Sequence, residues 1–163
     1  MNKITTLEME IAIFNYFNPR QNIIIPNMFW SHFNHELDMC IISKRGYITE
    51  VEIKVSKYDL IKDKLKRHGH FSQDIKRLFF AIPEGLLCHR EHIPERAGIL
   101  IAGHRNSKTS KDKILKLRIY RLPQPYYQAR KLTDEEVFDF TRLGTMRLLG
   151  LKKKIFRLKR RMD

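Results

Sequence analysis

The sequence predicts an α/β fold in which helices flank a central mixed β-sheet. Three observations support this prediction. A β-hairpin pattern runs from Glu36 to Val55, with a turn at Gly46 that needs a positive φ. The runs 77–83 (RLFFAIP) and 98–102 (GILIA) are short and, apart from Arg77, apolar, as in strands buried on both faces. Helical patterns alternate with these strands along the chain.

The N-terminal part of the chain predicts a helix followed by an edge strand. The helix is expected over about 7–17, capped by Thr5 or Thr6 and ended by Asn18-Pro19. Its apolar stripe would comprise Met9, Ile13, Phe14 and Phe17. The segment 21–30 is rich in Ile and aromatic residues but contains Pro26, which indicates an edge strand or a strand that runs into a loop.

After the hairpin, a helix is expected over about 57–68, with Ser56 as its cap and Gly69 at its end. A last, half-exposed strand is expected over 114–122, where polar and apolar residues alternate. The stretch 133–136 (TDEE) is a capping box for a C-terminal helix to about 149. We therefore expect a single domain over 1–150 and a basic, amphipathic tail over 151–163.

Net charge narrows the choice of partner. The chain has 32 Lys and Arg against 18 Asp and Glu, a formal charge of +14. Such an excess favours a polyanion, and nucleic acid fits because each neutralised phosphate releases counterions. Ribosomal and membrane-surface proteins are also basic, so charge alone does not choose among them.

The cellular compartment is expected to be the cytoplasm. The two cysteines, Cys40 and Cys88, have no CxxC spacing, which argues against a disulfide framework and a zinc ribbon. Residues 1–14 are acidic where a signal peptide would be basic. No apolar run approaches the ~20 residues that a membrane span requires.

Charged side chains on the predicted hairpin form a candidate catalytic site. Side chains two apart on a strand share a face, so Glu50, Glu52 and Lys54 point to one side. The other strand of the hairpin carries Glu36 and Asp38, and pairing across the turn brings Asp38 toward Glu52. A solvated strand face with cross-strand ion pairs is the alternative interpretation.

Carboxylates from neighbouring strands are the ligands that Mg²⁺ prefers. A bound ion polarises a phosphate and lowers the pKa of a coordinated water. The ammonium of Lys54 could orient that water or offset charge that develops on the phosphate. The pattern therefore predicts metal-assisted phosphodiester hydrolysis.

Asp38, a short hairpin and then Glu52-Ile53-Lys54 resemble the D…ExK signature of the PD-(D/E)XK nuclease superfamily. The stretches 50–68 (EVEIKVSKYDLIKDKLKRH), 75–87 (IKRLFFAIPEGLL) and 93–102 (IPERAGILIA) are similar to its mitomycin-resistance DNA-repair branch, over roughly 36–102. The resemblance implies a restriction-endonuclease-like core of helix, three strands, helix and strand.

The resemblance also implies roles for single residues. Asp38 and Glu52 would bind Mg²⁺ or Mn²⁺ together with the Ile53 carbonyl, and Lys54 would be the base or the stabiliser. Many members add a glutamate from the first helix, for which Glu8 and Glu10 are available. We favour Glu10, which borders the apolar stripe. The sequence departs from the superfamily at Leu37, where a proline often precedes the first aspartate.

Basic residues near the proposed site and in the tail are candidates for DNA binding, although both groups also fit a merely solvated face. They are Lys57, Lys62, Lys64, Lys66 and Arg67, with Lys152, Lys153 and Lys154 in the tail. His35, beside Glu36, could titrate near the site, although a surface position is expected.

The sequence thus predicts a divalent-metal-dependent deoxyribonuclease, for DNA repair or for processing phage or mobile-element DNA, possible as a homodimer and without a membrane partner. The alternatives are a non-catalytic DNA-binding protein on the same scaffold and a peripheral membrane protein held by its tail.

Overall fold

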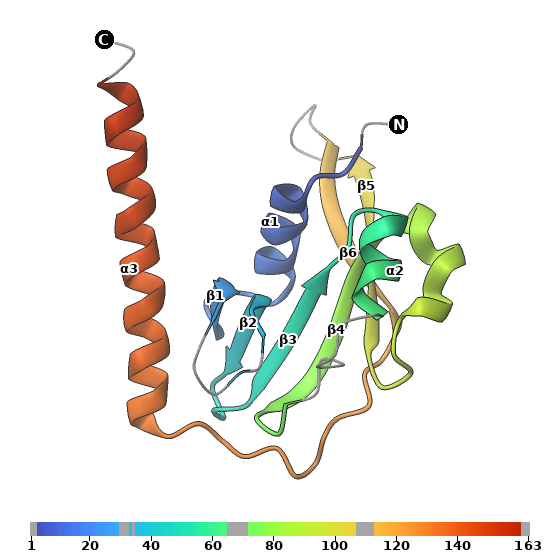
Figure 1. Ribbon diagram of the computed structural model, residues 1–163, viewed down its shortest axis with the longest axis horizontal. Coiled ribbons are helices and arrows are strands. Elements are labelled where there is room, and N and C mark those ends of the chain that lie inside the picture. Colours follow the sequence, from blue (N-terminus) through green and yellow to red (C-terminus); the bar gives the residue numbers. More distant parts are fainter. Residues whose placement is uncertain (1–2, 30–32, 34, 65–71, 107–112, 161–163) are drawn as a thin grey trace. The chain divides into compact units, whose positions relative to one another are not determined.

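The computed structural model describes residues 3–29, 33, 35–64, 72–106 and 113–160 (Figure 1). The chain divides into two compact units, Met1–Lys131 and Leu132–Asp163. This boundary lies earlier in the chain than the one expected at 150, because the whole C-terminal helix belongs to the second unit.

The first unit contains a six-stranded mixed sheet with helices on both faces. Its elements are α1 (Thr6–Tyr16), β1 (Asn22–Met28), β2 (Leu37–Ser43), β3 (Ile48–Ile53), α2 (Lys57–Lys64), β4 (Ile75–Pro83), the 3-10 helix η1 (Glu84–His92), β5 (Gly98–Asn106) and β6 (Lys113–Arg121). The strands lie side by side in chain order, from β1 to β6. The pairs β3–β4 and β4–β5 are parallel and the other pairs are antiparallel. The predicted α/β class with a mixed sheet is confirmed.

The N-terminal half follows its local sequence closely. Thr5 and Glu8 form a capping box, in which the Thr5 amide donates to Glu8 Oε2 at 2.7 Å. Strand β1, which contains Pro26, is an edge strand as predicted. The turn between β2 and β3 holds Gly46 at φ 79°. The apolar stripe of α1 differs from the expected one, because Phe14 is exposed and Ala12 is buried.

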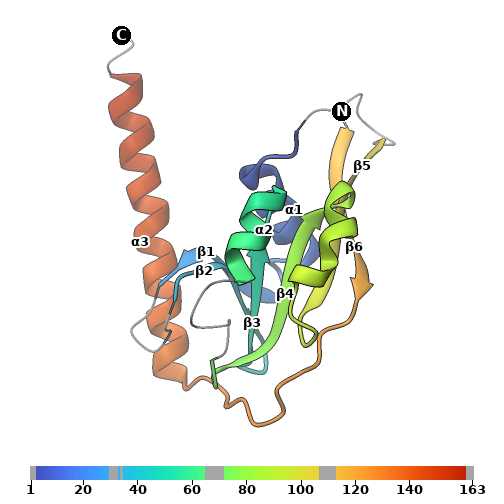
Figure 2. The same ribbon diagram turned by 45° about the vertical axis from the view of Figure 1, so that its right-hand side comes forward.

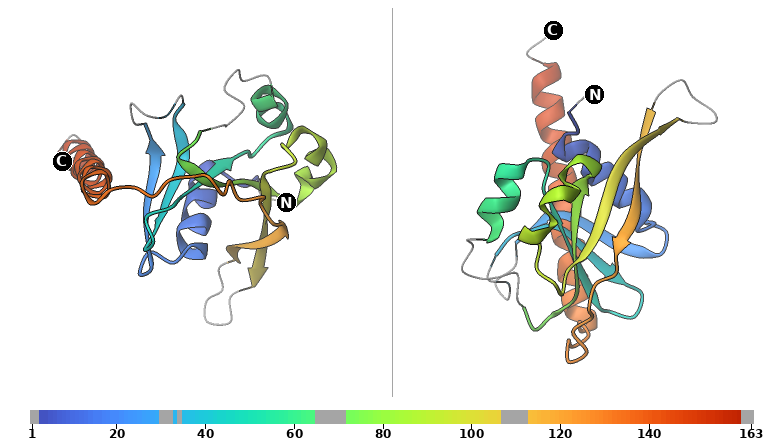
Figure 3. Two further views of the ribbon diagram at one scale, coloured as in Figure 1. Left: turned by 90° about the horizontal axis from the view of Figure 1, so that it is seen from below. Right: turned by 90° about the vertical axis from the view of Figure 1, so that its right-hand side faces the viewer.

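Two apolar clusters cover the two faces of the sheet. On the face that we call the α1 face, the cluster comprises Met9, Ile13, Met39, Ile41, Val51, Ile53, Phe79, Ala81, Leu100 and Ala102. On the opposite, α2 face it comprises Leu60, Leu78, Phe80, Ile82, Ile93, Ala97, Ile99 and Ile101. Two turned views show α1 on one side of the strands and α2 with η1 on the other (Figure 2, Figure 3). All six residues of β3 are buried between these layers.

The second unit contains the helix α3, Asp134–Lys159. Thr133 and Glu136 form the predicted capping box. The predicted end near 149 is wrong, since the helix continues through Gly150. One glycine costs a helix only about 1 kcal/mol relative to alanine, and the Leu and Lys residues around it favour helix. Among the described residues, no helix is both long enough and apolar enough to span a membrane.

Candidate metal and catalytic site

Charged side chains are buried on the α2 face of strand β3. Glu50 is 0% exposed, Glu52 is 1% exposed and Lys54, just after the strand, is 6% exposed. Val51 and Ile53, between them, point to the α1 face. The shared face predicted for the three charges agrees with this alternation, but the interpretation as a solvated face is wrong because all three residues are buried.

Lys54 forms two buried ion pairs. Its Nζ lies 2.6 Å from Glu52 Oε2 and 2.7 Å from Asp63 Oδ1, and 5.8 Å from the centroid of the Phe80 ring. Asp63, on α2, is 5% exposed. It was not a predicted site residue, because it lies between two lysines in a run interpreted as a basic face. Its place three residues after the buried Leu60 was the available indication, since such pairs share one side of a helix.

The charge state of Lys54 follows from this environment. Burial acts to lower its pKa, but the carboxylates of Glu52 and Asp63 together outweigh that effect and raise the pKa above its ordinary value. The side chain is therefore an ammonium at neutral pH. Of the two roles that the sequence left open, a charge stabiliser fits this arrangement and a proton acceptor does not.

Asp38 lies against the backbone of the same segment. Its Oδ2 accepts a hydrogen bond from the Ile53 amide at 2.8 Å. The β2–β3 register pairs Cys40 with Glu50, so continuing it by two residues brings Asp38 beside Glu52. The N–H and C=O of one strand residue face the same neighbouring strand, so the Ile53 carbonyl also faces β2. Asp38 and the Ile53 carbonyl thus share one edge of β3.

A second group of ligand atoms lies on the same face. His35 Nε2 is 2.6 Å from Glu50 Oε1, and His35 is 8% exposed. One ligand atom from each of His35, Glu50 and Glu52 lies within 4.8 Å of the others. The expectation of a surface position for His35 is wrong. Its burial depends on tertiary packing before β2, which the local sequence does not reveal.

A second cation, the guanidinium of Arg96, lies near the Glu50 carboxylate. Arg96 is half-buried; burial lowers its pKa, and the nearby Glu50 carboxylate opposes that effect. Among the described residues, three buried carboxylates, those of Glu50, Glu52 and Asp63, thus lie near Lys54 and Arg96. Buried carboxylates together with an imidazole suit divalent cations chemically.

Other predicted residues lie elsewhere. Glu10 belongs to α1, which packs through Met9 and Ile13 on the α1 face, so the structure places it across the sheet from Glu52 and Lys54. It does not bring Glu10 into this site. Glu36 is exposed.

The predicted DNA-binding lysines are exposed wherever the structure describes their side chains. Lys57 and Lys62 are exposed on α2, and Lys152, Lys153 and Lys154 are exposed on α3. The side chain of Lys64, and Lys66 and Arg67 entirely, lie outside the described residues.

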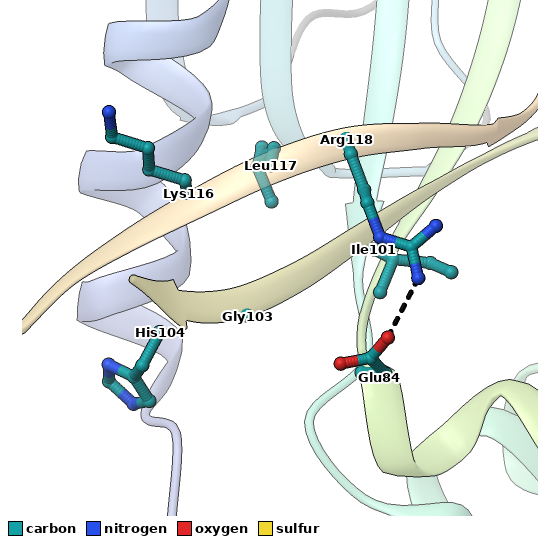
Figure 4. A pocket seen from close by; sticks show the side chains of 7 residues that line it. All are labelled: Glu84, Ile101, Gly103, His104, Lys116, Leu117 and Arg118. Carbon is teal, nitrogen blue, oxygen red and sulfur yellow. Dashed lines mark hydrogen bonds and ion pairs between the residues drawn. The ribbon is translucent and has the colours of Figure 1, made fainter. Parts of the chain in front are cut away.

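A pocket of about 190 Å³ lies apart from these residues, between η1 and strands β5 and β6. Figure 4 shows Arg118 reaching to Glu84, with Nη2 and Oε1 2.7 Å apart. His104 and Lys116 also line it. It contains none of the buried carboxylates of β3, so it is not part of the candidate site.

The fold and this site define an α/β protein with a buried carboxylate and lysine cluster on one face of a mixed sheet. A solved structure, the "SPO1766 protein of unknown function from Silicibacter pomeroyi", is similar with a TM-score of 0.61 and 18% sequence identity. The similarity covers 93% of this chain and 92% of that chain, and it shows a shared fold. No family model matches the chain, and no curated protein matches it.

Proposed function

We propose that this protein is a divalent-metal-dependent deoxyribonuclease that hydrolyses DNA phosphodiester bonds. The observation that supports the proposal best is the contact between the Asp38 carboxylate and the Ile53 amide, at 2.8 Å. This contact holds Asp38 beside Glu52 and Lys54. Lys54 Nζ lies 2.6 Å from Glu52 Oε2. An aspartate, a glutamate and a lysine from two neighbouring strands are thus held at one place.

The order of the elements supports a restriction-endonuclease-like core. The sequence resemblance implied a helix, three strands, a helix and a strand. Helix α1, strands β1 to β3, helix α2 and strand β4 follow one another in that order. The proposed motif occupies β2 and the end of β3 within this series.

The residues would divide the chemistry among them. Asp38, Glu52 and the Ile53 carbonyl would hold a Mg²⁺ or Mn²⁺ ion, which polarises a phosphate and lowers the pKa of a coordinated water. Lys54 would offset the negative charge that develops on the phosphate oxygens. Asp63 holds the Lys54 amine at 2.7 Å, which would limit the reorganisation that this stabilisation needs.

The proposed substrate is DNA because of the charge of the protein surface. The chain carries +14 overall, and Lys57 and Lys62 are exposed on α2, the helix that carries Asp63. Lysines of this kind bind phosphates without reading sequence.

Cleavage assays test the proposal. Purified protein is incubated with linear, circular, branched and single-stranded DNA, with and without Mg²⁺ or Mn²⁺. Wild type is expected to cut in a metal-dependent manner, and Glu52→Gln and Asp38→Asn should each lose at least about 100-fold in rate. Both substitutions keep the shape of the side chain, and circular dichroism checks the fold. Glu135→Gln, an exposed acidic position on α3, is the matched control.

DNA affinity separates the proposal from its alternative. The two variants should bind DNA as tightly as wild type, since neither removes a basic side chain. Binding without cleavage by wild type in either metal would favour a non-catalytic DNA-binding protein on the same scaffold. If the wild-type protein neither binds nor cleaves DNA, the nuclease hypothesis and the DNA-binding hypothesis are both rejected.

A further inference from the structure

His35, Glu50 and Glu52 form a second set of converging metal-ligand atoms, separate from the Asp38 edge of β3. One ligand atom from each lies within 4.8 Å of the others, and the His35 Nε2 to Glu50 Oε1 distance is 2.6 Å. Atoms that bind one ion with bonds of about 2.1 Å lie about 3 to 4 Å from each other. Small side-chain rotations would therefore suffice to place all three around one cation.

The backbone fixes two of these ligands. Glu50 and Glu52 are two residues apart on β3, which pairs with β2 on one side and β4 on the other, so their carboxylates leave the same face of an interior strand. His35 lies two residues before β2, the neighbouring strand. The three side chains are 8%, 0% and 1% exposed, so the ligand atoms are held by packing.

Electrostatics favours a cation at this place. Glu50 and Glu52 are carboxylates of like charge, and in a buried environment their repulsion is much stronger than in water. Arg96 acts on Glu50, and Lys54 acts on Glu52 and Asp63. A divalent ion between the two carboxylates would attract both at once, and the His35 imidazole would supply its third ligand.

We propose that His35, Glu50 and Glu52 bind a divalent transition-metal ion, with Mn²⁺ or Zn²⁺ preferred over Mg²⁺. An imidazole nitrogen suits transition metals, whereas Mg²⁺ takes oxygen ligands. Glu52 also belongs to the Asp38 site of the proposed nuclease. A catalytic role for this second ion rests on the proposed function, because Glu52 would then bridge two ions, as in two-metal phosphodiester hydrolysis. The metal site itself does not depend on it.

Mn²⁺ binding by the full-length, metal-free protein tests the site. Electron paramagnetic resonance counts bound Mn²⁺ during a titration. His35→Asn and Glu50→Gln should each weaken one class of bound Mn²⁺ at least about 10-fold, while Asp38→Asn should leave that class unchanged. His92→Asn is the matched control, because His92 also lies near a glutamate, 3.5 Å from Glu91, but outside the converging set.

A second measurement needs no variant. Pulsed electron paramagnetic resonance of Mn²⁺ bound to wild type should detect a coupled imidazole ¹⁴N nucleus. Absence of that coupling, or Mn²⁺ affinity that is the same in wild type, His35→Asn and Glu50→Gln, would overturn the inference. Mn²⁺ bound through His35 without any DNA cleavage would instead contradict the proposed function. If Glu50→Gln cleaves DNA as fast as wild type, and wild type shows no ¹⁴N coupling, only the second metal site is contradicted.

Discussion

The two faces of strand β3 are equally buried and chemically opposite. Val51 and Ile53, on the α1 face, are 0% and 7% exposed, and Glu50 and Glu52, on the α2 face, are 0% and 1% exposed. Burial of an apolar side chain stabilises the fold by about 1.5–3 kcal/mol. A buried charge destabilises it unless it is paired. The comparison suggests that Val51 and Ile53 supply stability, whereas Glu50 and Glu52 are buried charges maintained at a cost that a functional site would explain.

The largest expected effect comes from placing a charge on the apolar face. Val51→Asp would bury a carboxylate among side chains that offer it no cation. We expect a loss of more than about 4–5 kcal/mol, enough to unfold many domains. Far-ultraviolet circular dichroism and urea unfolding measure it. Glu52→Gln, on the other face of the strand, should stay folded. A wild-type unfolding midpoint for Val51→Asp would show that the two faces do not differ as described.

Removal of the cation from the charged face should have the next largest effect. Lys54→Met leaves the carboxylates of Glu52 and Asp63 buried without the ammonium, so we expect a loss of about 3–5 kcal/mol in the metal-free protein at neutral pH. The double variant with Asp63→Asn should recover part of that loss. Lys62→Met, exposed on α2, is the stability control and should change little. Strict additivity of the two substitutions would contradict coupling between Lys54 and Asp63.

The rates at which a reagent modifies the two thiols test whether the α2 face excludes solvent, and here a smaller effect is expected. Cys40 lies opposite Glu50 in the β2–β3 register and is buried, whereas Cys88 is exposed. Burial, reinforced by the Glu50 carboxylate, raises the pKa of the Cys40 thiol. At pH 8 a thiol reagent should therefore modify Cys88 quickly and Cys40 only after unfolding. Equal rates for both in the native protein would show that this face is open.

The same thiol should make stability depend on pH. In the folded protein Cys40 keeps its proton, while in the unfolded chain it loses it above about pH 8.5. Unfolding thus releases a proton at high pH, so this group lowers stability as pH rises, by at most about 1.4 kcal/mol per pH unit. Urea unfolding of wild type and Cys40→Ala at pH 8 and 10 measures the difference between their slopes.

The elements of the fold were predictable because their determinants are local. The capping threonines Thr5 and Thr133, the turn at Gly46 and the proline in β1 each mark one boundary within a few residues. The end of α3 was not predictable in this way, since Gly150 ends some helices and is tolerated in others.

The candidate site was predictable only in part. Asp38, Glu52 and Lys54 follow from strand periodicity and the hairpin turn. The alternation over 47–56 is the same for a solvated face and for a buried charged face, so the sequence left both open. The choice between a solvated and a buried face depends on packing by α2 and η1 on this side of the sheet, and both helices lie further along the chain. The sequence placed Glu50 on the charged face but did not identify it as a ligand. His35 and Asp63 join the cluster through tertiary packing, so the local sequence did not assign them to the site.

The two outer strands of the sheet carry different obstacles to self-association. Pro26 in β1 has no amide hydrogen, so this border cannot offer a full ladder of donors to another chain. The opposite border, β6, exposes Lys116, whose charge would repel an identical strand. A second copy of this protein would therefore be unable to extend the sheet easily at either side, and a dimer would have to form through some other surface.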